Sequence, residues 1–149
     1  MPTKTVEFRS VIKTTPEAMF AFHSAPGAFA KLTPPPVFIQ VLRDDRASFT
    51  EGEIEFRMWV AFIPVHWVAR HEPGPIATSF IDRLLAGPLA SWEHHHIFQA
   101  VDGGTELIDR ITFMHKAGLA GLLTRLFFDG LSLRFLFAYR HWRTRRALT

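Results

Sequence analysis

The stretch from Leu119 to Arg146 constrains the fold most, because its pattern predicts one long helix with more apolar surface than a solvent-exposed helix carries. At about 100° per residue, one arc of this helix is apolar and the opposite arc is charged. The apolar arc holds Phe127, Leu131, Phe135, Ala138 and Trp142, and the charged arc holds Arg125, Asp129, Arg140 and Arg143. Further apolar residues widen the first arc: Leu122, Leu126, Leu133 and Phe137. We therefore expect the Phe127–Trp142 arc to pack against a partner that curves around the helix, as a bent sheet does.

The composition indicates a single domain over residues 1–149, since a chain of 149 residues buries roughly two-thirds of its unfolded surface. Hydrophobic residues make up 48% of the chain, and 15 of these are Phe, against one Tyr. Phenyl rings need no hydrogen-bond partner when they are buried. A solid Phe-rich core and a cavity lined with aromatic rings are both compatible with this composition.

The chain also disfavours several functional classes. It contains no cysteine, which excludes disulfides and thiolate sites. The first residues lack the apolar run of a signal peptide, and the longest apolar run, Met58 to Val65, is shorter than the about 20 residues that a spanning helix needs. We expect a cytoplasmic protein with no transmembrane segment. The net charge of +3 comes largely from arginines at a helix end, so we expect no nucleic-acid partner.

The first 36 residues predict one strand and two short helices. Residues 5–13 alternate in polarity, with Val6, Phe8 and Ile12 on one face. A helix should then start at Thr15, which can cap it and is followed by a proline at the first helical position. The Pro26-Gly27 pair ends this helix, a second short helix fits residues 28–32, and the prolines at 34–36 end that one.

After the prolines the polarity pattern changes to a period of two, which predicts six more strands. They cover residues 37–42, 53–62, 65–72, 78–85, 92–100 and 105–115. In the clearest of them one face carries Ile54, Phe56, Met58, Val60 and Phe62. Asp102-Gly103-Gly104 predicts a tight hairpin between the last two. Because strands and helices do not alternate, we expect an α+β fold with a seven-stranded antiparallel sheet.

Strand parity predicts a polar cluster on the inner face of this sheet. Three strands contribute inward-facing residues: Phe80, Asp82 and Leu84; Trp92, His94, His96 and Phe98; and Leu107, Asp109, Ile111 and Phe113. By the same parity His95 faces outward, as does Arg110, which we expect to be solvated. Two carboxylates and two imidazoles should therefore converge on one inner wall, where buried charge is costly unless it is paired.

Four interpretations of the polar cluster remain open. The histidines and aspartates can simply satisfy one another, or they can anchor the polar end of a ligand in an apolar pocket. A third interpretation is general acid–base catalysis, since a His beside an Asp titrates near neutral pH. The fourth, metal binding, is the least favoured, because no third strong ligand is evident and two His–Asp pairs can satisfy each other. We expect no metal and no cofactor.

The order of elements resembles the START-like superfamily, also called SRPBCC or Bet v 1-like, which has the helix-grip fold. Several motifs are similar to those of its bacterial ligand-binding and polyketide cyclase/dehydrase-type branch: Phe20-x-Phe22-His23, Leu32-Thr33-Pro34-Pro35, Gly87-Pro88, Trp92-x-His94-x-His96-x-Phe98 and Leu107-x-Asp109-Arg110. The resemblance spans the whole chain. It implies a seven-stranded curved antiparallel sheet wrapped around a long C-terminal helix, with two short helices after the first strand. It also implies a hydrophobic ligand held between sheet and helix.

From these observations we predict binding of a small hydrophobic molecule that is lipid-, polyketide- or sterol-like. The candidate ligand-binding residues are Phe56, Met58, Phe80, Asp82, Trp92, His94, His96, Phe98, Asp109 and Phe113. The alternative is an enzyme of the polyketide cyclase or dehydratase type that uses His94, His96 and Asp109 as acid and base. A third hypothesis is an interaction module with a solid core. The sequence leaves a homodimer open.

Overall fold

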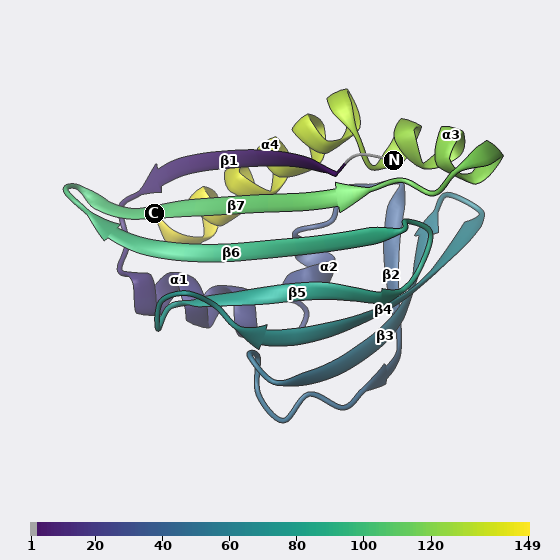
Figure 1. Cartoon of the computed structure of the whole chain (residues 1–149). Coiled ribbons are helices and arrows are strands. Elements are labelled where there is room, and N and C mark those ends of the chain that lie inside the picture. Colours follow the sequence, from purple (N-terminus) through teal and green to yellow (C-terminus); the bar gives the residue numbers. More distant parts are fainter. Residues whose placement is uncertain (1–2) are drawn as a thin grey trace.

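A computed structural model describes residues 3–149 as one curved antiparallel sheet with helices on its concave side (Figure 1). The sheet has seven strands in the order β1-β7-β6-β5-β4-β3-β2. Its strands are β1 (Lys4–Ile12), β2 (Val37–Asp44), β3 (Gly52–Val60), β4 (Ile63–Pro73), β5 (Ser79–Ala86), β6 (Ser91–Val101) and β7 (Gly104–Met114). The helices are α1 (Pro16–Ser24), α2 (Ala28–Lys31), α3 (Gly118–Phe127) and α4 (Gly130–Leu148).

This architecture confirms the predicted fold class. All seven expected strands are present, with bounds within two residues of those predicted, and α1 and α2 follow β1. Strands β2 to β7 form a meander, whereas β1 pairs with β7 at the far edge. The β6–β7 hairpin has Val101 paired with Gly104, so Asp102 and Gly103 form its tight turn. In the part of the chain that the structure describes, no helix is long and apolar enough to cross a membrane.

Local sequence signals explain how the chain leaves β1. The hydroxyl of Thr15 accepts a hydrogen bond from the backbone N–H of Ala18 at 3.1 Å and so caps α1, with Pro16 at its first position. Gly27, with φ of 79°, separates α1 from α2. A left-handed backbone of this kind is accessible to glycine at little cost.

The predicted C-terminal helix is present, but it is bent into two segments. Helix α3 ends at Phe127 and α4 begins at Gly130, whose φ is 52°. Between them, Phe128 turns into the core and is buried. The carboxylate of Asp129 accepts a hydrogen bond from the backbone N–H of Gly130 at 2.8 Å and caps α4. Because of this bend, α3 and α4 run in different directions. A helical wheel drawn for one continuous straight helix therefore does not describe both segments.

The predicted packing face of this helix is wrong. The arc that was expected to pack on the sheet is exposed, with Leu131 80% and Phe135 63% accessible and Phe127, Ala138 and Trp142 also exposed. The buried face instead carries Leu133, Phe137, His141 and Thr144. Two of these residues are polar, so a wheel that ranks faces by apolarity selects the wrong side. Their burial is compensated by hydrogen bonds, since His141 binds Ser10 and Asp109, and Thr144 binds the carbonyl of Arg140.

Strand parity is confirmed by burial. The inner-face residues of β6 and β7 are buried, including His94, His96 and Asp109. His95 points to the outer face, where its imidazole bonds Glu93 at 2.7 Å. The expectation for Phe62 is wrong, because β3 ends at Val60 and the side chain of Phe62, in the following turn, is 91% exposed.

The apolar core consists of two clusters. One gathers Ile54, Phe56, Trp67, Ala69, Leu89, Trp92, Ile111, Phe113, Phe128, Leu133 and Phe137. The other gathers Ile12, Met19, Phe80, Phe98 and Leu107. On the inner face of β5, β6 and β7, one or two polar residues of each strand lie between the members of the two clusters. The polar cluster therefore lies between two apolar regions.

Candidate functional site

Asp109 is the centre of the buried polar cluster. Its Oδ1 lies 2.7 Å from Nε2 of His94 on β6, and its Oδ2 lies 2.7 Å from Nε2 of His141 on α4. The other ring nitrogen of His141, Nδ1, lies 2.6 Å from the hydroxyl of Ser10 on β1. Because a carboxylate only accepts hydrogen bonds, both histidines donate Nε2–H to Asp109. Nδ1 of a neutral His141 is then left to accept from Ser10.

Burial by itself raises the pKa of Asp109, but hydrogen bonds from His141 and His94 lower it further than burial raises it. The pKa of this carboxyl is consequently held well below its ordinary value, and Asp109 is ionised at neutral pH. The pKa of His96 is lowered as well, but for an imidazole this favours the uncharged form. Its burial, together with the nearby His94, holds the pKa of the His96 imidazole well below its ordinary value, so this ring is neutral.

His96 is held by ring contacts alone. Its imidazole stacks on Phe80 with ring centroids 4.0 Å apart and on His94 with centroids 3.5 Å apart. Neither of its ring nitrogens has a hydrogen-bond partner among the described residues, and the same holds for Oδ1 of Asp82. The closest carboxylate oxygen, Oδ1 of Asp109, lies 3.5 Å from His96 Nδ1 without hydrogen-bond geometry. An unpartnered buried polar group costs about 1–3 kcal/mol.

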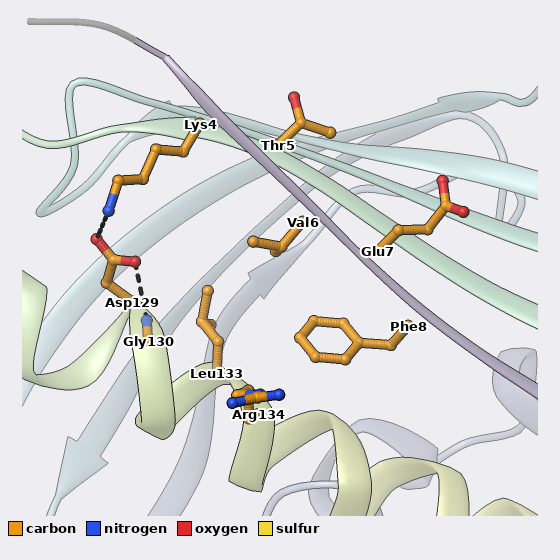
Figure 2. A pocket seen from close by; sticks show the side chains of 9 residues that line it. All are labelled: Lys4, Thr5, Val6, Glu7, Phe8, Asp129, Gly130, Leu133 and Arg134. Carbon is orange, nitrogen blue, oxygen red and sulfur yellow. Dashed lines mark hydrogen bonds and ion pairs between the residues drawn. The ribbon is translucent and has the colours of Figure 1, made fainter.

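Two open grooves run between β1 and α4 and share Glu7, Phe8 and Arg134. The first has a volume of about 460 Å³ and is lined by Val6, Phe8 and Leu133, with Lys4 and Asp129 forming an ion pair at its end (Figure 2). The second has a volume of about 650 Å³. Its walls include Phe8, Phe137 and Trp142, its polar groups are Ser10 and His141, and its charged groups are Glu7, Arg9, Arg134 and Arg145. The polar cluster therefore reaches the second groove through His141.

The structure brings some of the predicted site residues together and separates others. Asp82, His94 and His96 have ligand atoms within 4.8 Å of one another, and Asp109 bonds His94. The predicted apolar residues divide between the two core clusters: Phe56, Met58, Trp92 and Phe113 belong to one, and Phe80 and Phe98 to the other. The two grooves are lined by other residues than these ten.

Ser10 and His141 were not among the residues predicted from the sequence. Ser10 lies on the inner face of β1, in step with Val6, Phe8 and Ile12, and parity could have placed it there. His141 follows Phe137 by one helical turn, and a wheel centred on Leu133 and Phe137 would have turned it inward. The opposite arc carries more apolar residues, and for that reason it was predicted to be the buried one.

A curved seven-stranded antiparallel sheet around a bent C-terminal helix, with two short helices after the first strand, defines the helix-grip fold. Comparison with solved structures confirms this fold, which the START-like resemblance of the sequence implied. No protein-family model matches the sequence, and no curated protein sequence matches it.

Three solved structures illustrate this likeness. An aromatase/cyclase from a Streptomyces species is 16% identical, with a TM-score of 0.68 over 98% of this chain and 96% of that chain. The protein Ara h 8.0201 is 14% identical, with a TM-score of 0.61 over 95% of this chain and 98% of that chain. A nucleoside-diphosphate sugar epimerase from Corynebacterium glutamicum is 27% identical, with a TM-score of 0.66 over 95% of this chain but only 28% of that chain.

Proposed function

We propose that the protein binds a small, mostly apolar molecule in the second groove between β1 and α4, with the polar end of the molecule at Ser10 and His141. The observation that carries this proposal is the groove itself. It has a volume of about 650 Å³ and combines apolar walls with a Ser–His pair that is linked to the buried Asp109. Pockets for small ligands typically measure about 300–1,000 Å³ and combine apolar walls with a few polar groups.

The charges at the groove favour a particular kind of polar end. Arg134 and Arg145 line the groove together with the Ser10–His141 pair. The groove has a single carboxylate, that of Glu7, and this carboxylate pairs with the guanidinium of Arg9. Carbonyl, carboxylate or phenol oxygens suit such a set, because guanidinium groups donate but do not accept. We therefore propose a lipid-, polyketide- or sterol-like ligand with an oxygen at one end. The helix-grip neighbours support this general class, and one of them is named as an aromatase/cyclase.

The ten ligand-binding residues predicted from the sequence do not line this groove, and they would contact a ligand only if it lay deeper inside the protein. A molecule that passed His141 would meet His94 and His96 next, since both His141 and His94 bond the same Asp109. In that position the ligand would lie between Phe80 of β5 and Trp92 of β6.

A blocking substitution tests the groove without touching the core. Ala138 lines the groove and is exposed, so Ala138→Trp should fill it and leave the fold intact. Leu131→Trp is the matched control, because Leu131 is exposed on the same helix but lines neither groove. A dansyl-labelled fatty acid, titrated by fluorescence, should bind Ala138→Trp at least about tenfold more weakly and the control unchanged. Equal affinity for both variants would place the ligand elsewhere.

A second candidate function is acid–base catalysis of the cyclase or dehydratase type. It is favoured by the continuous hydrogen-bond chain from Ser10 through His141 and Asp109 to His94, which joins the groove to the interior. In the sequence-based hypothesis His94, His96 and Asp109 act as acid and base, and the structure adds His141 as the member that lines the groove.

Replacing His141 by Gln separates the two functions. Gln retains hydrogen-bonding capacity but cannot transfer protons, so a binding protein should change its affinity for the fatty acid by about tenfold or less. An enzyme should lose turnover of an acyl or polyketide analogue by roughly 10² to 10⁴ while binding is kept. Conversion of such an analogue by the wild type, with binding but no conversion by His141→Gln, would replace the binding proposal with the catalytic one.

A further inference from the structure

The unpartnered imidazole of His96 requires an explanation that the hydrogen-bond chain does not supply. The residue is 4% exposed, and both of its ring nitrogens lack a protein partner. Buried polar groups in native proteins nearly always have a partner, which can be protein, water or an ion. The chain Ser10–His141–Asp109–His94 ends without reaching His96 in hydrogen-bond geometry.

Two further ligand atoms face the same place. Oδ1 of Asp82 is buried and also without a partner, and Asp82 lies directly opposite His94 in the β5–β6 register. His94 donates Nε2–H to Asp109, which leaves the lone pair of its Nδ1 free in the neutral ring. One ligand atom from each of Asp82, His94 and His96 lies within 4.8 Å of the other two.

From this arrangement we propose that Asp82, His94 and His96 bind one divalent first-row transition-metal ion. Two imidazoles and one carboxylate form the donor set typical of zinc and non-haem iron sites. With metal–ligand bonds near 2.0–2.2 Å, ligand atoms lie roughly 3–3.5 Å apart, so the three side chains move closer together when the ion binds. Asp82 is only partly buried and can move, and the ring of His96, which has no hydrogen bond to lose, can turn toward Nδ1 of His94.

The surroundings of the three ligands support the same site. A metal-bound histidine commonly donates its other N–H to a carboxylate, which fixes the tautomer and orients the ring. Asp109 already has this role toward His94, and it is itself held by His141. The charge balance also favours a cation. Asp82 and Asp109 place two carboxyl groups at the cluster, and a single guanidinium, that of Arg140, is attracted to both.

This inference reverses the expectation from sequence that no metal binds. That expectation assumed that two aspartates would satisfy two histidines of β6. In the structure Asp109 bonds His94 and His141, and the histidine from α4 thus takes the oxygen that His96 would have needed. His96 and one oxygen of Asp82 are left over as a pair of open ligands.

The site is tested by metal titration of chelator-treated full-length protein. Co²⁺ is followed by its visible absorption and Zn²⁺ by calorimetry. We expect one ion per chain with micromolar or tighter affinity, and a rise in melting temperature on loading, because an ion that binds only the folded state stabilises it. His96→Ala and Asp82→Ala should each weaken binding by about tenfold or more.

Two histidine variants outside the site are the controls. His95→Ala removes the outward-facing neighbour that bonds Glu93, and His66→Ala removes an exposed histidine that bonds Glu55. Both should bind the ion as the wild type does. Near-ultraviolet circular dichroism shows whether each variant is folded. Asp82→Ala is the second variant if His96→Ala does not fold, because Asp82 is less buried.

Ala138→Trp, which blocks the proposed ligand groove, should leave metal binding unchanged, so failure of the metal site and failure of the ligand groove are distinguishable. The inference is overturned if the wild type shows no saturable binding, which would assign the unpartnered atoms to water. It is equally overturned if His66→Ala or His95→Ala abolishes binding while His96→Ala and Asp82→Ala retain it.

Discussion

Phe137 and Phe135 offer a direct test of how α4 is rotated against the sheet. The two residues lie two positions apart on the same helix, yet Phe137 is 2% exposed and Phe135 is 63% exposed. The ring of Phe137 stacks on Phe8 of β1 with centroids 4.8 Å apart and meets His94 edge-on at 5.2 Å. Phe137→Ala should therefore be strongly destabilising, and Phe135→Ala nearly neutral.

The magnitude follows from what the Phe137 ring contacts. Burying a phenylalanine side chain contributes about 1.5–3 kcal/mol, and the stacked pair with Phe8 adds about 0.5–1.5 kcal/mol. Truncation also leaves a cavity under the helix, so we expect a loss of about 3–5 kcal/mol for Phe137→Ala. For Phe135→Ala the change in the free energy of unfolding should stay within about 0.5 kcal/mol, as for other surface substitutions.

Both variants are measured by guanidinium chloride denaturation, with the wild type beside them and with the slope of the transition checked for each. The same residue type and the same substitution are compared on one helix, so differences in helix propensity cancel. A loss at Phe135 equal to or larger than that at Phe137 would refute the rotation and restore the wheel drawn from sequence.

Three further predictions concern buried or capping charges. Burial lowers the folded-state pKa of His23 from 6.5 to about 4, so the unfolded chain takes up a proton first and stability falls as pH drops from 6.5 toward 4. Between pH 7.5 and 5 this amounts to about 2 kcal/mol, and denaturation curves of His23→Gln should lack that part; an unchanged pH dependence would contradict it. Asp109→Asn should cost about 3 kcal/mol by chemical denaturation because two imidazoles lose a charged acceptor, whereas Asp102→Asn in the exposed β6–β7 turn should cost almost nothing; equal costs would mean that the buried pairing contributes little. Asp129→Ala should cost about 1–2 kcal/mol and speed amide exchange at the start of α4, and Lys4→Ala, which removes only the ion pair, should leave that exchange slow; fast exchange in both variants would assign the effect to the ion pair.

Much of the fold, and Asp82, His94, His96 and Asp109 of the polar cluster, could be predicted because they depend on local geometry. Alternation of side chains across a strand is a property of the extended backbone, so Trp92, His94, His96 and Phe98 were placed inside from spacing alone. The helix start at Thr15 and the hairpin turn at Asp102 likewise depend on a few neighbouring residues. Nothing distant is needed to make these features.

The tertiary structure decided which face of α4 is buried and how the histidines pair. Large apolar side chains lie on both the buried and the exposed side of this helix, as Phe137 and Phe135 show, so local polarity selects the wrong face. The position of β1 and β7 decides which face is buried. The pairing of His141 with Asp109 joins residues 32 positions apart and determines that His96 is left without a partner. The sequence could name the groups that meet inside the sheet, but only the packing of the helix could determine which of them are satisfied, because hydrogen bonds depend on distances that no residue spacing contains.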